Sequence, residues 1–245
     1  MPPSLYTSWW CSGAWLRCNK NMIVSWLMAA AVLVTPPGLD TARDRQDRPA
    51  LEKFAAEFGT AADKAPQDAD VQYHAALAES YSAEVALELR DKRQAQQAAE
   101  KGIKAAEKAI SLKPNVAEYY RVLGTLYGQA AAGNVLAALS YGKKARDAVA
   151  KAIELDPKST RAYVARAVGN YYLPPAFGGG PDLAIADLHK ALELDPKNAE
   201  AYLWLGLSLR QSKKNAEARQ AFQKALDINP NRVWVKQQLE QTPAQ

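Results

Sequence analysis

The sequence predicts an all-α protein built from stacked pairs of antiparallel helices. The motif Lys-Ala-(Ile/Leu)-x-(Leu/Ile)-x-Pro occurs four times, beginning at Lys108, Lys151, Lys190 and Lys224. Each copy is typical of a helix end, because its proline cannot continue the helix. A repeat every few tens of residues indicates an array in which each unit packs only on its neighbours.

The last unit carries the repeat in its most regular form. The interval from Pro196 to Pro230 is 34 residues long. Small and apolar residues recur in it at three- and four-residue steps and so share helix faces: Tyr202, Leu205, Gly206 and Leu209, then Ala218, Phe222 and Ala225. Length and residue types together resemble the tetratricopeptide repeat (TPR), which implies a right-handed helical solenoid with a C-terminal capping helix.

The earlier units keep this pattern, with one departure. The unit after Pro114 repeats it at Tyr120, Leu123, Gly124 and Tyr127, and again at Ala145, Val149 and Ala152. In the unit after Pro157, Arg166 and Asn170 stand where the last unit has leucines. Either this helix is rotated, or these polar side chains face an unusual partner.

The units differ in length. The proline intervals are 48, 43, 39 and 34 residues, so the first three units carry insertions of 14, 9 and 5 residues. The first two insertions contain mainly helix-forming residues, which predicts lengthened helices. The third, within 173–181, is rich in Pro and Gly and predicts a loop. We expect Phe177 in this loop to pack against a helix, with a ligand-contacting lid as the alternative.

The order of these units resembles exported bacterial TPR proteins. It is also similar to the TPR domain of regulator-of-microtubule-dynamics proteins over about residues 68–240. We therefore predict a solenoid over residues 50–240 and a tail at 241–245. The predicted parts are a half repeat at 50–66, units at 67–114, 115–157, 158–196 and 197–230, and a cap at 231–240.

Residues 1–42 are predicted to be a signal peptide or a signal-anchor. The apolar run Met22–Val34 follows Arg17 and Lys20, the order of a secretory signal. Cleavage after Ala42 and membrane attachment through residues 22–34 both stay open, and residues 43–49 are expected to form a flexible linker. This segment implies export to the periplasm, or anchoring in the inner membrane facing the periplasm.

The composition does not favour an enzyme, a metal site or nucleic-acid binding. Cys11 and Cys18 both lie in the N-terminal segment, and neither His74 nor His189 has a partner at metal-ligand spacing. The net charge of +5 is spread among acidic residues rather than gathered in a stripe. We expect no catalytic residue, no cofactor, no metal and no nucleic-acid partner.

First-helix residues outside the core pattern are expected to line a concave groove. These are Arg121, Thr125, Arg161, Val164, Val168, Tyr171, Tyr172, Leu203, Trp204, Leu207 and Arg210. Aromatic and arginine side chains dominate interface energies, and the arginines would orient acidic or carbonyl groups of a partner. The alternative is that Tyr171, Tyr172 and Trp204 pack on neighbouring helices or on the Phe177 loop.

The sequence therefore predicts a non-enzymatic scaffold that binds a protein or peptide segment in its groove, in the bacterial cell envelope. Two alternatives stay open. One is a periplasmic accessory subunit of a transporter that binds a small ligand, and the other is a self-assembling structural protein of the envelope.

Overall fold

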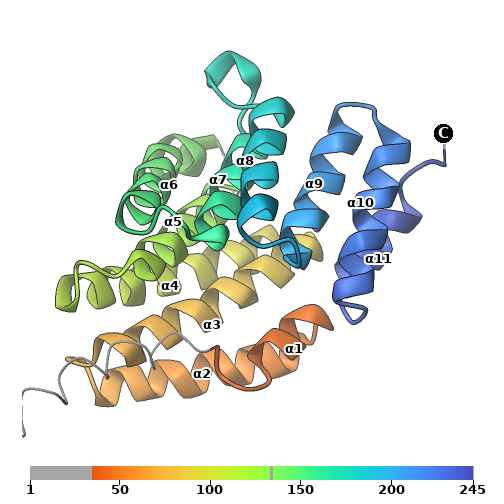
Figure 1. Cartoon of the computed structure of the whole chain (residues 1–245). Coiled ribbons are helices and arrows are strands. Elements are labelled where there is room, and N and C mark those ends of the chain that lie inside the picture. Colours follow the sequence, from red (N-terminus) through yellow and green to blue (C-terminus); the bar gives the residue numbers. More distant parts are fainter. Residues whose placement is uncertain (1–34, 133–134, 245) are drawn as a thin grey trace, which may run out of the picture. The chain divides into compact units, whose positions relative to one another are not determined.

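The computed structural model describes residues 35–132 and 135–244, and within these ranges it contains eleven α-helices and no strand (Figure 1). Residues from Thr35 onward form one compact unit. The predicted signal segment, apart from its last residues, lies outside the described residues. None of the described helices is both long and apolar enough to cross a membrane.

Most of the described helices form antiparallel pairs, which confirms the predicted all-α repeat architecture. The pairs are α3 (Ala69–Glu88) with α4 (Lys92–Leu112), α5 (Ala117–Ala131) with α6 (Val135–Leu155), α7 (Thr160–Tyr172) with α8 (Pro181–Leu194), and α9 (Ala199–Gln211) with α10 (Asn215–Ile228). They are flanked by α1 (Leu39–Asp44) and α2 (Arg48–Lys64) at one end and by α11 (Val233–Glu240) at the other.

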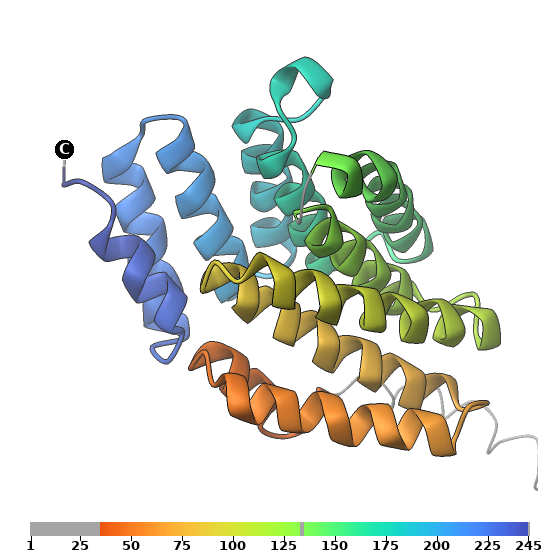
Figure 2. The same ribbon diagram turned by 180° about the vertical axis from the view of Figure 1, so that it is seen from behind.

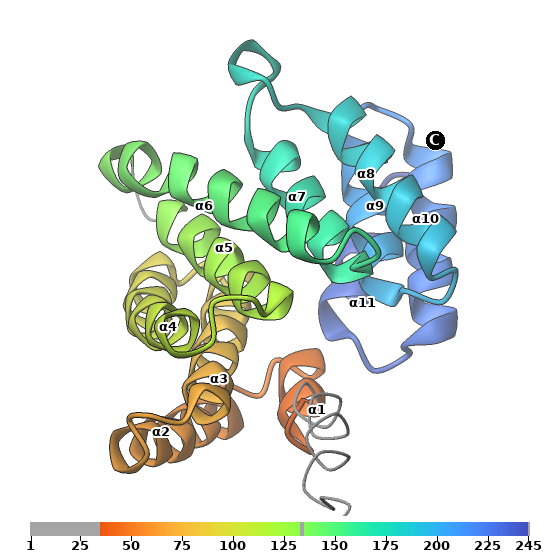
Figure 3. The same ribbon diagram turned by 60° about the vertical axis from the view of Figure 1, so that its left-hand side comes forward.

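The first helices of the pairs form a layer of their own. Helix α3 contacts α5, α5 contacts α7, and α7 contacts α9. Figure 3 shows this inner layer, with the second helices α4, α6, α8 and α10 outside it. The arrangement, seen from behind in Figure 2, brings α1 and the turn before α11 side by side.

Lengthened helices account for the first two insertions, and a loop accounts for the third. Helices α3 and α4 have 20 and 21 residues, against 13 and 14 in the regular pair α9 and α10, so each is seven residues longer. Helices α5 and α6 have 15 and 21 residues, two and seven more than the regular pair. Helices α7 and α8 have the regular lengths, and the third insertion lies in their connecting loop. The predictions for all three insertions are confirmed.

Three of the turns between units share a helix cap. The residue two positions after the repeat proline caps the next first helix with its side chain at Asp68, Ser159 and Asn198, whereas Val116 after Pro114 makes no side-chain cap bond. Each side-chain oxygen accepts a hydrogen bond from a backbone N–H that the helix leaves unpaired. After Pro230 the corresponding residue is Arg232, whose side chain makes no cap bond.

Small residues allow the helices of a pair to approach. A Cβ added at Gly206 would lie 2.5 Å from a ring atom of Phe222, and one at Gly124 would lie 2.5 Å from Val149. Ala225 on α10 is fully buried.

Arg166 and Asn170, the polar residues that replace leucines in the third unit, share one partner on the paired helix. Asp187 on α8 accepts two hydrogen bonds from Arg166, at 3.0 and 2.6 Å, and one from Asn170 at 3.0 Å. Since Asp187 is buried, this three-residue cluster replaces the apolar contact made by leucines in the last unit. Of the two explanations for the departure, the unusual partner is the one that the structure shows.

The flexible linker expected at 43–49 is wrong, and the packed array begins before residue 42. Leu39 and Ala42 lie in α1 and are buried in the core cluster of the first units. Asp47 accepts a hydrogen bond from Ala50 N at 3.1 Å and caps α2. Charge alone suggested a solvated linker, whereas these charged residues cap a helix and pair with other units.

Candidate functional site

The predicted groove residues of the second unit are engaged within the protein. Arg121 is largely buried and donates hydrogen bonds to Glu118 at 2.7 and 2.6 Å. Thr125 donates its hydroxyl to the carbonyl of Arg121 at 3.0 Å. Burial by itself would raise the pKa of Glu118, but the charge and hydrogen bonds of Arg121 hold it below its usual range.

Arg161, at the start of α7, extends the same charged group. Its Nη1 lies 3.4 Å from Glu118, while more than half of its side chain stays exposed. Tyr73 on α3 donates its hydroxyl to Glu118 at 3.3 Å. Arg161 therefore keeps accessible surface for a partner, whereas Arg121 is paired with Glu118 inside the protein.

Arg210, the last of the predicted arginines, is also engaged. It donates hydrogen bonds to Gln238 Oε1 at 2.6 Å and to Thr242 Oγ1 at 3.2 Å. These contacts tie α9 to α11 and to the residues after it, so Arg210 supports the C-terminal cap in this conformation.

The predicted apolar positions divide into buried and accessible ones. Leu203 and Leu207 are fully packed in the core cluster of the last two units and present almost no surface to a ligand. The helix turns them toward neighbouring helices rather than into open space. Val164 and Val168 on α7 are half-buried.

Four aromatic side chains from α7, α9 and α11 form one cluster: Tyr171, Tyr172, Trp204 and Trp234. Trp204 lies at its centre, with ring centroids 5.6 Å from Tyr171, 6.0 Å from Tyr172 and 5.5 Å from Trp234, all edge-to-face. The rings pack on one another, which is part of what the alternative interpretation expected. We call this group the aromatic cluster.

Tyr172 is the accessible member of the aromatic cluster. It is 65% exposed, although the surrounding protein desolvates its hydroxyl and, with Tyr171, Glu88 and Glu84, raises its pKa to about 12. A large exposed ring, backed by other rings that hold it in place, is the type of surface that binds partner proteins.

The loop between α7 and α8 projects beyond the helices (Figure 1) and presents Phe177. This side chain is 71% exposed, so the expectation that it packs against a helix is wrong. The loop backbone is nevertheless fixed, because Gly180 N donates to Asn170 O at 2.8 Å. Gly178 and Gly180 have φ values of 81° and 106°, which only glycine adopts easily. Helix α8 begins at Pro181.

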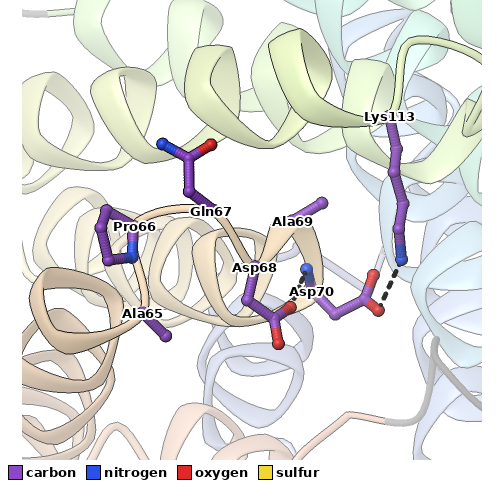
Figure 4. Close-up of a pocket in the computed structure, with 7 residues that line it drawn as sticks. All are labelled: Ala65, Pro66, Gln67, Asp68, Ala69, Asp70 and Lys113. Atoms are coloured by element: carbon purple, nitrogen blue, oxygen red, sulfur yellow. Dashed lines mark hydrogen bonds and ion pairs between the residues drawn. The ribbon is translucent and has the colours of Figure 1, made fainter.

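An open pocket of about 520 Å³ lies away from the predicted site, at the turn between α2 and α3 (Figure 4). Its polar lining residues bond one another, since Asp68 accepts from Asp70 N at 3.0 Å and Lys113 Nζ lies 2.8 Å from Asp70. It contains none of the predicted groove residues, so we place the candidate site at the aromatic cluster instead.

A charged cluster around Arg232 joins the two ends of the array. Arg232, only 1% exposed, donates hydrogen bonds to Glu84 and Glu88 of α3 and to Glu200 of α9. Sequence reasoning missed this cluster. The available clue was Arg232 itself, a charged residue at a position where three other turns carry a helix-capping side chain.

Among the described residues, no group of three or more His, Cys, Asp and Glu side chains could hold a metal ion. His189 is exposed on α8. Cys11 and Cys18 lie outside the described residues.

Two family models match the chain. Regulator of microtubule dynamics protein 1-3 matches residues 40–172, just over half of the chain, and a tetratricopeptide repeat model matches residues 177–233. No curated protein sequence matches.

Several solved structures are similar. A thermophilic TPR protein of Thermus thermophilus is 19% identical, with 82% of this chain and 96% of that chain covered and a TM-score of 0.58. This likeness shows the TPR fold. MamA of Desulfovibrio magneticus is 16% identical, covering 82% and 99% of the two chains with a TM-score of 0.44. YrrB, described as a TPR protein with an unusual peptide-binding site, is 20% identical, covering 83% and 91% with a TM-score of 0.40.

Proposed function

Because the chain belongs to the regulator of microtubule dynamics protein 1-3 family and its repeats have the TPR fold, we propose that it is a non-enzymatic scaffold that binds a protein or peptide segment. The proposed binding surface lies on α7 and α9 of the inner layer and on the flanking helix α11. The observation that carries the proposal is the aromatic cluster, with Tyr172 open to solvent and three rings behind it.

The chemistry of this surface defines the partner segment. The ring of Tyr172 favours an apolar or aromatic side chain, because burying such groups removes apolar area from water. Arg161 lies at the other end of the same helix, and more than half of its side chain stays exposed for a carboxylate or carbonyl of the partner. The proposed partner is therefore a segment with an apolar anchor and, roughly 16 Å away along α7, an acidic or carbonyl group.

Site-specific photo-crosslinking in cells tests this proposal. The photoreactive residue is placed at Tyr172 and, in the matched control, at the exposed Lys190 on the outer helix α8. A discrete protein adduct from position 172 alone, identified by mass spectrometry, supports the scaffold. Equal adducts from both positions, or none from either, would contradict a binding surface at the aromatic cluster.

We also propose that this scaffold works in the cell envelope. The support is the order of Arg17, Lys20 and the apolar run Met22–Val34 in the sequence. A fusion to alkaline phosphatase, which folds only outside the cytoplasm, tests the proposal. Phosphatase activity is expected with the native N-terminus and is expected to disappear when Val24 and Leu27 are both replaced by Asp. Activity that persists in this variant would contradict export by the apolar run.

A further inference from the structure

The charged cluster around Arg232 points to a conformational device. We propose that Arg232 is a reversible latch that holds the first and last units of the array together. The inference concerns the closure of the array and does not depend on which partner binds the aromatic cluster.

The latch joins four elements. Arg232 Nη2 lies 2.5 Å from Glu84 Oε1 and 2.5 Å from Glu88 Oε1, both on α3, and Nε lies 3.2 Å from Glu200 Oε1 on α9. Asp44 on α1 is 3.8 Å from the same Nε. One guanidinium therefore bridges α1, α3 and α9 from the turn between α10 and α11.

Polar contacts beside Arg232 join the same two ends. Asn229 donates its side-chain amide to Asp44 at 2.7 Å, and Gln46 donates to Glu88 at 2.8 Å. Gln237 on α11 donates to Gln46 at 3.2 Å. The contacts from Asn229 and Gln237 span 185 and 191 positions of sequence, so they connect opposite ends of the array.

The apolar cores of the two ends are separate. One core cluster runs from Leu39 to Ala148 and includes α1 and α3, whereas the other runs from Ala167 to Val235 and includes α9 and α11. Among the described residues, no shared apolar core joins the two ends of the array, so the latch closes a polar interface. Polar interfaces between packed units allow the units to move relative to each other. For this reason we call the latch reversible.

Both sides of the latch depart from the repeat. Arg232 takes the position at which three other turns carry a capping side chain and one carries Val116, and it makes no side-chain cap bond. A first helix of the regular 13 residues, starting at Ala69, would end at Tyr81. Glu84 and Glu88 both lie in the seven-residue extension of α3 that follows. The extension of α3 and the turn before α11 therefore supply the two sides of this contact.

The regular part of α3 contacts α1 rather than Arg232. The hydroxyl of Tyr81 donates to Asp40 of α1 at 2.8 Å, and the centroid of its ring lies 4.8 Å from the guanidinium carbon of Arg43. The carboxylates of α3 that reach Arg232 come from the extension alone, so the lengthened helix is what makes the closure possible.

The charge balance makes the closed arrangement depend on Arg232. Among the ion pairs of the described residues, two cations, Arg232 and Arg43, face four carboxylates: those of Asp44, Glu84, Glu88 and Glu200. With Arg232 in place, the four carboxylates share two cations. Without it, Arg43 alone would face four carboxylates, and repulsion between like charges would separate the ends.

Distance measurements between the two ends test the latch in the full chain. Cys11 and Cys18 are replaced by Ser, and spin labels are attached to cysteines introduced at the exposed Thr60 of α2 and Lys224 of α10. Pulsed electron–electron double resonance then gives the distribution of label distances. We expect one population in the otherwise native chain and an added, longer-distance population in Arg232→Gln.

Two further variants separate the latch from general damage. Arg219→Gln removes an arginine that donates to Leu239 O and Thr242 O within the last unit, and it should keep the native distribution. Adding Glu84→Gln and Glu88→Gln to Arg232→Gln removes the repulsion and should shift the distribution back toward the native one.

Two results would overturn the latch. One is an unchanged distance distribution in an Arg232→Gln protein that keeps its native helix content by circular dichroism. The other is loss of that helix content in Arg232→Gln while Arg219→Gln stays folded, since Arg232 would then be required for the fold and would not be a reversible contact.

Discussion

Arg232 and Glu88 lie 144 positions apart in the sequence, yet Nη2 of Arg232 is 2.5 Å from Oε1 of Glu88. In a repeat array each unit needs to contact only its neighbours. This pair instead joins the first unit to the turn that follows the last. The guanidinium of Arg232 also lies 5.7 Å from the ring centroid of Trp234, so the closure adjoins the aromatic cluster.

The stability of the folded chain is expected to fall as the pH rises. Burial raises the pKa of Glu84 to about 7, against the opposing charges of Arg232 and Arg43 and with the help of Glu200 and Glu88. A carboxyl whose pKa is raised in the folded state favours that state when protonated, and this contribution is lost as the pH rises through the folded pKa. We therefore expect the melting temperature to fall between pH 5.5 and pH 8.

The variant Glu84→Gln provides the control for this pH dependence. The amide cannot ionise, so the decline between pH 5.5 and pH 8 should become shallower. The groups that face Glu84 are Arg43 and Asp44 on α1, Tyr81 and Glu88 on α3, Tyr172 on α7, Glu200 on α9 and Arg232 before α11. A melting temperature that rises over this range in the native chain would contradict the assignment.

Gly206→Ala should destabilise the last unit. The new methyl group would lie 2.5 to 2.8 Å from three ring atoms of Phe222, and overpacking of this kind costs about 1–3 kcal/mol. Gly169→Ala is the matched control, because no atom lies within 4 Å of its added Cβ and the higher helix propensity of Ala should stabilise by about 0.5–1 kcal/mol. Urea denaturation measures both. Equal effects of the two changes would rule out the close approach at Gly206.

Asp187→Ala should destabilise the third unit. The change leaves Arg166 and Asn170 without the buried acceptor that they share, and losing hydrogen bonds to a charged group costs about 1.5–3 kcal/mol. Glu193→Ala, which removes an exposed partner of Lys190 on the same helix, should cost less than about 1 kcal/mol. Chemical denaturation of both variants compares them, and a loss at Glu193 as large as that at Asp187 would argue against the polar cluster.

Phe177→Ser should leave stability within about 0.5 kcal/mol of the native value, because a surface side chain loses little on substitution. Phe222→Ala, which empties a fully buried position, should cost about 3–5 kcal/mol. Thermal unfolding followed by circular dichroism makes the comparison. A large loss at Phe177 would mean that its ring packs against a helix in solution.

The sequence predicted the repeat well because repeat structure depends on local patterns. Helix faces, the small residues at Gly206 and Ala225 and the division of the insertions all follow from spacing and residue type. The prediction of a flexible linker at 43–49 failed because it used local charge alone. Local charge cannot show that Asp44 accepts a hydrogen bond from Asn229 at the other end of the array.

Local sequence patterns could not predict the contacts between the two ends of the array or the exposure of single side chains. In the sequence, Leu203 and Leu207 occupy first-helix positions outside the core pattern, as the other predicted groove residues do. Only the packed structure shows that they are buried. Arg232 could have been noticed as a charged residue at a position where three turns carry a helix cap, but its partners Glu84 and Glu88 follow from how the units close.

The central claim, that the aromatic cluster binds a partner segment, is tested most directly by an affinity measurement. The segment identified by crosslinking at position 172 is titrated by isothermal calorimetry against the native chain, Tyr172→Ser and the control Ile228→Ser, which changes another exposed apolar residue. We predict at least a roughly tenfold loss of affinity for Tyr172→Ser, as for a residue that dominates an interface, and none for the control. Equal affinities for all three proteins would contradict the claim.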